Sequence, residues 1–465
     1  MKVAFVSSEV YPFIKTGGLA DVAYSLPKAL QEIGHEVAVF LPKYRVLKQE
    51  LLENIELATE VDVHGKRFYI ECVKYDFVTY YLVHEPSLYQ NDKIYESFNQ
   101  DYEFAIFSDV VLKSLEHLGF QADVIHCNDW QTGLIPFFLT QRYSHQPFYK
   151  EMSSVYTIHN LRFQGQFSSH AIRSLGYEYL DEQINYMKTG ILHAKAISTV
   201  SPTYAKEILT DFYGEGLNHV LQQRQNDLFG IVNGIDIKFF DPTQDAYLVS
   251  GYNDQSLSIK SVNKSGLQIR HGLEISEDVP LIGIVTRFDS QKGLDLIMEV
   301  IEEILYHKEA QIFILGSGEK KYEDYFQTLR DRYPSQLGVY FGYNEALAHL
   351  VYGASDLFLM PSLYEPCGLS QLISLRYGTI PVVRETGGLN DTVQSYREDT
   401  KEGNGFTFTN YNAHDMLYTI RRGISYYHQK DIWHELQVKG MRGDYSWDHS
   451  AQQYVDVYRH ILANK

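Results

Sequence analysis

Short apolar runs alternate with segments of helical spacing along most of the chain. Residues 3–7 (VAFVS) form the first run, and residues 20–33 then place apolar side chains three and four positions apart before Gly34. Residues 37–41 (VAVFL) form the next run. Runs this short and continuous are typical of strands buried on both faces of a parallel sheet, and the three-and-four spacing is typical of a helix. The chain therefore opens as strand, helix and strand, which predicts an α/β fold.

This alternation occurs in two sets, separated by the polar and weakly periodic residues 241–279. The first set continues around residues 124–139 and 155–159. The second set consists of residues 281–286, 294–305, 311–315, 338–341, 357–360 and 379–383. We predict two Rossmann-like doubly wound domains, residues 1–240 and 241–447, that face a central cleft and meet at a boundary near residues 240–250.

The end of the chain, residues 448–465, has the spacing of a final helix. Tyr454, Val457, Tyr458 and Ile461 fall on one face of it. We predict that this apolar face packs against the rest of the protein.

The chain is acidic, with 59 Asp and Glu against 41 Lys and Arg and a net charge of −18. A nucleic-acid surface needs a basic stripe, so no nucleic-acid partner is predicted. Against this background, an anionic ligand requires a local cluster of cations.

The cysteines and the apolar runs bear on the compartment. Cys72, Cys127 and Cys367 are far apart and form neither a metal-binding spacing nor a disulfide framework. No run approaches the ~18 apolar residues of a membrane span. The apolar run at the N-terminus has four residues, too few for a secretory leader. We predict a cytoplasmic protein with no membrane partner.

The first motif that could carry chemistry is KTGGLAD, residues 15–21, between the first predicted strand and helix. Adjacent glycines let backbone N–H groups approach an anion, and the start of a helix adds partial positive charge. Lys15 adds a full charge. The alternative is an ordinary turn between a strand and a helix.

Arg287 and Lys292 lie in VTRFDSQKG, at the end of one predicted strand and the start of the next helix. Doubly wound folds bind ligands at this position, and two cations there could hold a diphosphate leaving group. The alternative is a pair of exposed surface cations. The chain contains no Asp-x-Asp motif, so we predict no metal ligands and no cofactor.

Glu365 lies in YEPCGLS, residues 364–370, between a buried run and another helix. A carboxylate at the end of a strand can accept hydrogen bonds from sugar hydroxyls, while the following N–H groups receive phosphate. The alternative is an acidic residue that stabilises the helix start. The remaining candidates each have an ordinary structural alternative and are Asp129, His159, Asn160, Asn233 and Tyr343.

Taken in order, the motifs resemble those of bacterial glycogen synthases and plant starch synthases. They are KTGGLAD, NDW, TIHN, VNGID, TRF-x-x-QKG, GY-x-EA, P-S-x-x-EPCGL and TGGL. The resemblance covers nearly the whole chain. It implies the glycosyltransferase B fold, with a C-terminal helix that returns to the first domain. It also implies transfer of glucose from ADP-glucose to the non-reducing end of an α-1,4-glucan such as glycogen. Because the donor bond and the product bond are both α, we expect retention of configuration, and the absence of an Asp-x-Asp motif predicts no metal requirement.

The resemblance also implies roles for individual residues. The motif at residues 15–21 becomes the donor-binding loop, Arg287 and Lys292 the diphosphate clamp, and the motif around Glu365 the loop that holds glucose and phosphate. His159 falls near the glucose 6-hydroxyl and Tyr343 near the adenine. The predicted catalytic residues are Lys15, His159, Arg287, Lys292 and Glu365. The predicted substrate-binding residues are Lys15, Thr16, Gly18, Asp21, Asp129, Asn160, Asn233, Tyr343, Cys367, Gly368 and Leu369.

Other protein classes share parts of this pattern. Another nucleotide-sugar transferase, an epimerase or a phosphorylase could use the same architecture. A dinucleotide oxidoreductase would need a third glycine where Lys321 follows Gly316 and Gly318. A carbohydrate-binding protein without activity would have no need of the cations. Polymer formation from ADP-glucose and a glucan primer separates the transferase from these alternatives.

Overall fold

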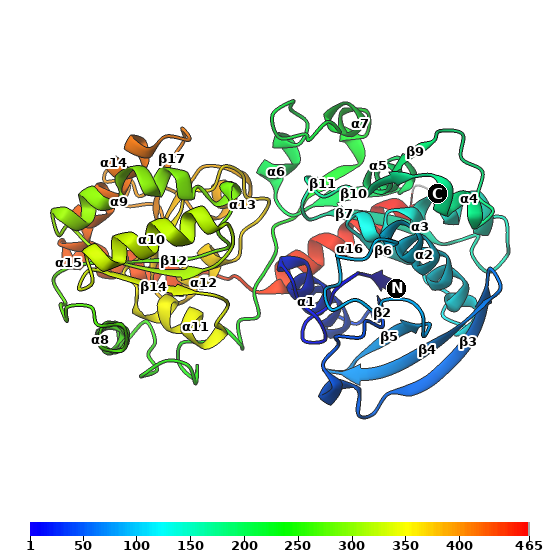
Figure 1. Cartoon of the computed structure of the whole chain (residues 1–465), viewed down its shortest axis with the longest axis horizontal. Helices are drawn as coiled ribbons and strands as arrows, with labels where there is room; N and C mark the ends of the chain where they lie inside the picture. The colour runs from blue at the N-terminus through cyan, green and yellow to red at the C-terminus, as the bar shows by residue number, and fades with distance from the viewer. Residues whose placement is uncertain (464–465) are drawn as a thin grey trace. The chain divides into compact units, whose positions relative to one another are not determined.

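The computed structural model describes residues 1–463, which form two compact units (Figure 1). Unit 1 contains Met1–Asn233 and the C-terminal segment that begins at Trp447, and unit 2 is Gly234–Ser446. The chain enters unit 2 earlier than the boundary predicted near residues 240–250. The reason is that Ile235 is already buried, in a cluster of apolar side chains that belongs to unit 2.

Unit 1 is built on a nine-stranded sheet with the order β11-β10-β7-β6-β1-β2-β5-β4-β3. Its strands are β1 (Lys2–Val6), β2 (Glu36–Pro42), β3 (Glu56–Val63), β4 (Lys66–Tyr75), β5 (Val78–His84), β6 (Val124–Asn128), β7 (Ser153–Ile158), β10 (Ala196–Thr199) and β11 (Leu228–Gly230). A separate antiparallel pair is formed by β8 (Gln166–Ser168) and β9 (Gln183–Asn185). Every pair in the large sheet is parallel except those that β4 makes with β3 and β5.

The antiparallel edge formed by β3, β4 and β5 adds to the parallel sheet expected of a doubly wound domain. Two tight turns join its strands, His64–Gly65 and Asp76–Phe77, and all four of these residues have positive φ. Positive φ at both central residues is the geometry of a two-residue hairpin. The signal was present in the sequence, because residues 56–84 contain β-branched and aromatic residues interrupted by His-Gly and Asp-Phe.

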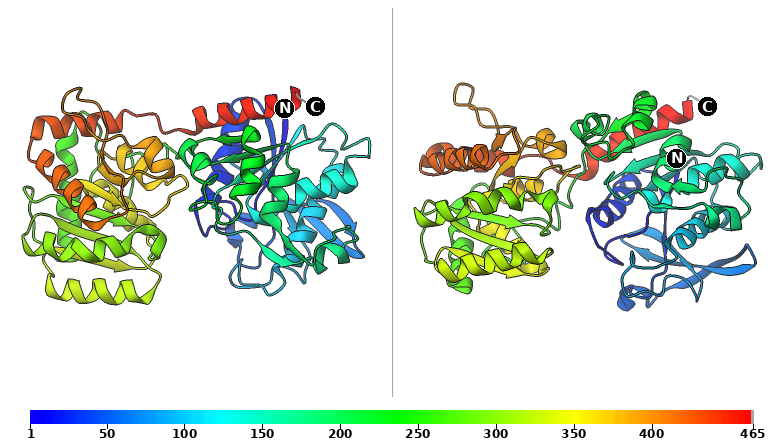
Figure 2. Two further views of the ribbon diagram at one scale, coloured as in Figure 1. Left: turned by 90° about the horizontal axis from the view of Figure 1, so that it is seen from above. Right: turned by 45° about the horizontal axis from the view of Figure 1, so that its top comes forward.

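The helices of unit 1 include α16 at the end of the chain. They are α1 (Gly18–Glu32), α2 (Gln100–His117), α3 (Leu134–Phe138), α4 (His170–Ser174), α5 (Tyr186–His193), α6 (Pro202–Glu207), α7 (Asn218–Gln223) and α16 (Trp447–Ala463). Figure 2 shows α16, in red, lying with the elements of unit 1. It buries the face predicted from its spacing, namely Tyr454, Val457, Tyr458 and Ile461. The last two residues of the predicted helix, 464 and 465, lie outside the described residues.

Unit 2 is built on a six-stranded parallel sheet with the order β14-β13-β12-β15-β16-β17. Its strands are β12 (Leu281–Val285), β13 (Gln311–Gly316), β14 (Leu337–Phe341), β15 (Leu357–Met360), β16 (Ile380–Arg384) and β17 (Phe406–Phe408). Counted within the unit, this order is 3-2-1-4-5-6, the arrangement of dinucleotide-binding domains. The parallel sheet predicted for this half is confirmed.

Helices cover both faces of this sheet because successive side chains on each buried strand point to opposite faces. They are α8 (Lys260–His271), α9 (Leu294–Tyr306), α10 (Lys320–Arg332), α11 (Glu345–Ala354), α12 (Ser370–Arg376), α13 (Gly387–Thr392), α14 (Ala413–Tyr427) and α15 (Lys430–Met441). Ile282 and Ile284 share a core with α9, α10 and α14. Leu281 and Phe313 share another with α8 and α11.

Each sheet has a point at which the strand order reverses. It lies between β1 and β6 in unit 1 and between β12 and β15 in unit 2. Connections leave in opposite directions there, which opens a crevice at the carboxyl ends of the strands, where ligands bind in such folds. The motifs around Lys15 and Asp129 follow β1 and β6, and those around Lys292 and Glu365 follow β12 and β15.

Candidate functional site

The loop that carries Lys15 and Thr16 is held by a carboxylate that the sequence analysis did not identify. Glu9 is 3% exposed and accepts hydrogen bonds from the Thr16 N–H at 2.5 Å and the Thr16 hydroxyl at 3.0 Å. Tyr95 donates to the same carboxylate at 3.2 Å. Burial raises the pKa of Glu9, while these hydrogen bonds act in the opposite direction. Glu9 therefore fixes the conformation of the loop before α1.

Neither backbone conformation nor packing requires glycine in this loop, and the two glycines leave open space beside it. The backbone of Gly17 is extended, with φ −155°, so other residues could adopt it. A Cβ built on Gly17 or Gly18 meets no atom within 4 Å. The N–H groups of Gly18 and Leu19 begin α1 and therefore have no acceptor within the helix. The start of α1 is thus an open place for an anion to approach backbone N–H groups.

Lys15 and Asp21, both predicted to contact the donor, are paired with each other. The Lys15 ammonium donates to Asp21 at 2.8 Å, and both side chains are about one-third exposed. An exposed pair of this kind is weak, on the order of 0–1 kcal/mol. A bound anion can therefore draw Lys15 away from Asp21 at little cost.

His159 lies next to the end of β6, in the strand order β7-β6-β1, and its protonation can be deduced from its neighbours. The Asn128 amide nitrogen donates to the Val6 carbonyl at 2.9 Å, so its amide oxygen faces His159 Nε2 at 2.9 Å. His159 Nε2 therefore carries a proton, which leaves Nδ1 as an acceptor. Burial lowers the pKa of His159 to about 3, so the ring is neutral at physiological pH.

Asp129 has an unusual backbone. Its φ of 56° and ψ of −178° fall in a region that non-glycine residues rarely adopt. The conformation is held by the Asp129 N–H, which donates to the Thr157 carbonyl, and by the carboxylate, which accepts from the His159 N–H at 2.8 Å. Burial raises the pKa of Asp129 to about 7. Asp129 thus connects the loops that follow β6 and β7.

In unit 2 the structure brings Lys292 and Glu365 together, although 73 positions separate them in the sequence. The Lys292 ammonium donates to Glu365 Oε2 at 2.8 Å, and the Ser362 hydroxyl donates to the same oxygen at 3.1 Å. Glu365 is 7% exposed. Two residues predicted to act on different parts of the donor therefore form one buried ion pair.

Glycines allow the loops around this pair to approach closely. Gly293 has φ 73°, and a Cβ there would lie 2.0 Å from the Pro361 carbonyl oxygen. The loop after β16 packs on the other side, where a Cβ on Gly387 would lie 1.8 Å from the carbonyl oxygen of Glu365. The Gly388 N–H also donates to that oxygen at 3.1 Å. The TGGL motif at 386–389 therefore supports the Glu365 loop.

The residues after Glu365 form a turn before α12. Gly368 has φ 71°, a left-handed conformation that favours glycine. The buried Gln371 donates to the carbonyls of Cys367 at 3.0 Å and Gly368 at 2.9 Å. Cys367 is buried and Leu369 is half-buried. Gln371, which the sequence analysis did not single out, thus fixes the carbonyls of the predicted phosphate-binding turn.

Arg287 and Tyr343 lie on loops that follow β12 and β14, at the carboxyl edge of the same sheet. Arg287 is mostly exposed, with its guanidinium 3.6 Å from Asp289. Tyr343 is 76% exposed. Both side chains are accessible to a ligand that crosses this edge.

The last two predicted contacts belong to unit 1. Asn160 is half-buried, and its side-chain oxygen accepts from the Arg162 N–H at 3.1 Å, as in a turn. Asn233 is the final residue before unit 2 and is 7% exposed. Its side-chain oxygen has no hydrogen-bond partner among residues 1–463. A buried acceptor of this kind favours a donor from a ligand or from water.

Within residues 1–463, no three His, Cys, Asp or Glu side chains converge in a way that could hold a metal ion. Within the same residues, none of the helices is both long enough and apolar enough to cross a membrane.

Family models match both halves of the chain. The model of the starch synthase catalytic domain matches residues 2–223, and the model of glycosyl transferases group 1 matches residues 267–431. Glycogen synthase of Geobacillus thermodenitrificans is 47% identical over 99% of this chain and 98% of that protein. Glycogen synthase of Bacillus cereus is 46% identical over 99% of this chain and 100% of that protein.

Solved structures match as well. The catalytic domain of starch synthase IV from Arabidopsis thaliana, bound to ADP and acarbose, has a TM-score of 0.92 at 32% identity over 99% of both chains. Sucrose-phosphate synthase from Thermosynechococcus elongatus has a TM-score of 0.65 at 16% identity over 100% of both chains, and therefore shares the fold alone. The chain belongs to the glycogen synthase and starch synthase family, whose members are hexosyltransferases of the glycosyltransferase B fold.

Proposed function

We propose that this protein transfers glucose from ADP-glucose to the non-reducing end of an α-1,4-glucan, with retention of configuration. The observation that carries the proposal is the buried Lys292–Glu365 pair at the reversal point of a dinucleotide-type sheet. A cation suits the departing diphosphate and a carboxylate suits sugar hydroxyls, so one pair covers both parts of the donor. The ADP held by the Arabidopsis relative supports the choice of nucleotide.

Charge explains how the donor would engage these residues. Departure of ADP develops negative charge on its terminal phosphate oxygen, and preorganised cations stabilise that charge. Lys292 already lies beside Glu365, so a diphosphate that carries more charge than one carboxylate competes for the ammonium. The released Glu365 oxygen can then accept hydrogen bonds from glucose hydroxyls.

The surroundings of Glu365 favour a positioning role over covalent attack. The Ser362 hydroxyl donates to the same Glu365 oxygen as Lys292, and glucose hydroxyls would take the place of the ammonium once the donor is bound. The lone pairs of this oxygen would therefore stay engaged in hydrogen bonds, which makes it a weaker nucleophile. We therefore infer that the acceptor 4-hydroxyl attacks the glucose C1 on the face from which ADP departs. The C1–O bond to phosphate breaks, the new C1–O4 bond forms, and the hydroxyl proton passes to the departing phosphate oxygen.

His159 would bind the sugar as a neutral ring. Its Nε2 proton is committed to Asn128, so Nδ1 can accept a hydrogen bond from the glucose 6-hydroxyl. A protonated ring would lack this acceptor. The low pKa of His159 therefore suits binding of a neutral hydroxyl.

We propose that transfer needs no metal, because Lys15, Arg287 and Lys292 supply the positive charge. The test is incorporation of labelled glucose into polymer from ADP-glucose and from UDP-glucose, with and without a glucan primer. Each reaction is repeated with excess EDTA. Primer-dependent incorporation from ADP-glucose that survives EDTA supports the proposal. Preference for UDP-glucose contradicts the assigned donor, and loss of activity that magnesium or manganese restores contradicts the role given to the cations.

A further inference from the structure

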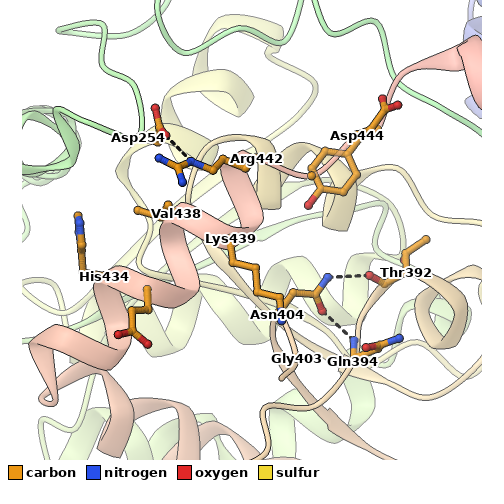
Figure 3. A pocket seen from close by; sticks show the side chains of 13 residues that line it. Asp254, Thr392, Gln394, Gly403, Asn404, His434, Val438, Lys439, Arg442 and Asp444 are labelled. Atoms are coloured by element: carbon orange, nitrogen blue, oxygen red, sulfur yellow. Dashed lines mark hydrogen bonds and ion pairs between the residues drawn. The ribbon is translucent and has the colours of Figure 1, made fainter. Parts of the chain in front are cut away.

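Unit 2 contains a pocket that no part of the proposed reaction uses. Its volume is about 920 Å³, and all of its lining residues belong to Gly234–Ser446. One wall is α15 and another is the segment from Thr392 to Asn404 (Figure 3). Asp444 and Tyr445 also line the pocket. Ligand pockets commonly have volumes of ~300–1,000 Å³, so this one can hold a ligand of several rings.

The pocket is separate from the loops assigned to the donor. Helix α13 has its first residue, Gly387, against Glu365 and its last, Thr392, in the pocket wall. Six residues of helix span about 9 Å. The pocket and the Glu365 loop therefore lie at opposite ends of one short helix.

The walls of the pocket are held in place. The Asn404 side chain accepts from the Gln394 N–H at 2.8 Å and donates to the Thr392 carbonyl at 3.0 Å (Figure 3). On the opposite wall, Arg442 donates to Asp254 at 2.7 Å. These contacts preorganise the pocket, which lowers the cost of binding a ligand.

The charge of the lining disfavours an anionic ligand. Three carboxylates, those of Asp254, Glu435 and Asp444, line the pocket with only two cations, Lys439 and Arg442. Arg442 is already engaged by Asp254. A phosphate or diphosphate would therefore enter a site with an excess of negative charge, in contrast to the loops of Lys15 and Lys292.

We propose that this pocket is a second carbohydrate-binding site, which holds a segment of the α-1,4-glucan away from the reacting end. This inference rests on the proposed function for the identity of the sugar. Sugar rings present hydroxyls at their edge and C–H groups on their face. The side-chain amides of Gln394 and Asn404 and the carboxylate of Glu435 can form hydrogen bonds with the sugar hydroxyls, and Tyr445 offers an aromatic surface for the C–H face. Lys439 extends from α15 toward Asn404 and adds a donor (Figure 3).

A second site changes how the enzyme treats long and short acceptors. A long chain can occupy the pocket while another of its ends reacts, so the effective concentration of acceptor ends rises. A trisaccharide cannot do both. The pocket should therefore matter for glycogen and not for maltotriose.

The test uses the full chain and the double variant Gln394→Ala, Lys439→Ala. The control is Asp431→Ala, an exposed position on α15 that does not line the pocket. Hydrogen exchange is measured with and without maltoheptaose, and with inorganic phosphate as a separate probe. We expect maltoheptaose to protect residues 394–404 and α15 in the wild type and the control and not in the double variant. We also expect the KM for glycogen to rise roughly 5- to 30-fold in the double variant, with maltotriose kinetics unchanged.

The possible outcomes separate this inference from the proposed function. Transfer from ADP-glucose without protection of the pocket overturns the second site alone. Protection of the pocket without any transfer supports the second site and contradicts the proposed reaction. Protection by phosphate in place of maltoheptaose, or an equal loss of glycogen and maltotriose turnover in the double variant, overturns the inference.

Discussion

Each cation assigned to the diphosphate lies beside a carboxylate that also belongs to the site. Lys15 is paired with Asp21, and Arg287 lies beside Asp289. Lys292 differs, because its partner Glu365 is buried and lies on the loop after β15, whereas Lys292 follows β12. Under the proposed function, a diphosphate would have to compete with a carboxylate for each of these three cations.

Lys292→Ala should reduce transfer without unfolding the protein. It removes a charge-assisted hydrogen bond of about 1.5–3 kcal/mol, so kcat/KM for ADP-glucose should fall roughly 10- to 150-fold. Arg287→Ala should lose at least as much, because a guanidinium can hold two phosphate oxygens. Initial rates and circular dichroism check this, with the exposed Lys320→Ala as control. Wild-type kcat/KM in both variants, or losses that follow the loss of folded protein, would contradict the clamp.

Glu365→Gln should separate binding from turnover. The amide leaves Lys292 without its anionic partner, so ADP should bind at least as tightly as in the wild type. The weakened contact with glucose should lower kcat by more than ~100-fold. Titration calorimetry with ADP and initial rates measure the two effects. A large loss of ADP affinity would show that Glu365 serves the nucleotide instead of the sugar.

His159→Ala should lower activity without moving its pH profile. The native ring has a pKa of about 3, against 6.5 for the unfolded chain. The unfolded chain therefore binds the extra proton between these values, so this group favours unfolding as pH falls from 6.5 toward 3 and has no such effect above 6.5. We expect kcat/KM to fall roughly 5- to 150-fold with the same profile between about pH 5.5 and 8. Loss of a titration step in the variant would mean that His159 titrates in the native enzyme.

At the scale of single elements, the two Thr-Gly-Gly-Leu motifs contain glycine for different structural reasons. Gly17 and Gly18, at the start of α1, face open space, whereas Gly387 and Gly388, which begin α13, contact the Glu365 loop. The same four residue types thus leave open space in one unit and allow close packing of backbone in the other. The sequence similarity of the two motifs does not report this difference.

A pair of substitutions tests that difference. Gly18→Ala places a methyl group in open space at the start of a helix, so thermal stability should stay the same or rise, while kcat/KM falls about 10-fold or more. Gly388→Ala places a Cβ 2.1 Å from the Cys367 carbonyl oxygen, so it should cost about 1–3 kcal/mol and lower Tm. Differential scanning calorimetry and initial rates measure both. Equal loss of Tm in the two variants would contradict the assignment of Gly18 to ligand access.

At the scale of the whole molecule, the end of the chain completes the first unit. Helix α16 packs on α1 and β7, and its Tyr458 hydroxyl lies 2.6 Å from Nδ1 of the buried His126 in β6. His126 Nε2 lies 2.6 Å from the Thr157 hydroxyl. Unit 1 therefore contains sequence from both ends of the chain, and its stability depends on both.

Tyr458→Phe should destabilise unit 1 and leave the chemistry intact. The change deprives a buried imidazole nitrogen of its partner, at a cost of about 1–3 kcal/mol. We expect a lower Tm with kcat/KM for ADP-glucose unchanged at temperatures where the protein is folded. The control is Tyr418→Phe, because Tyr418 is 73% exposed. An unchanged Tm would show that the Tyr458–His126 contact contributes little to the native state.

The sequence by itself determined the class of fold, the presence of a second domain and the order of the motifs. Local periodicity reports burial, so β1, α1, β2 and the strands of unit 2 other than β17 could be predicted close to their observed bounds. The face of α16 could be predicted for the same reason. Each site motif also comes directly after a strand, and this position could be predicted from the neighbouring sequence alone.

Only the tertiary structure decided which of these residues meet. The pairing of Lys292 with Glu365, and the contact of Gly387 with Glu365, depend on which strands are neighbours in the sheet. Strand order is a property of long-range packing, and no local pattern encodes it. Glu9 was missed because nothing in its own segment shows that a later loop supplies its hydrogen bonds. The antiparallel edge of unit 1 was missed because short buried runs indicate parallel strands, whereas the strands of this edge are half-exposed and are stabilised by turns and by neighbouring strands.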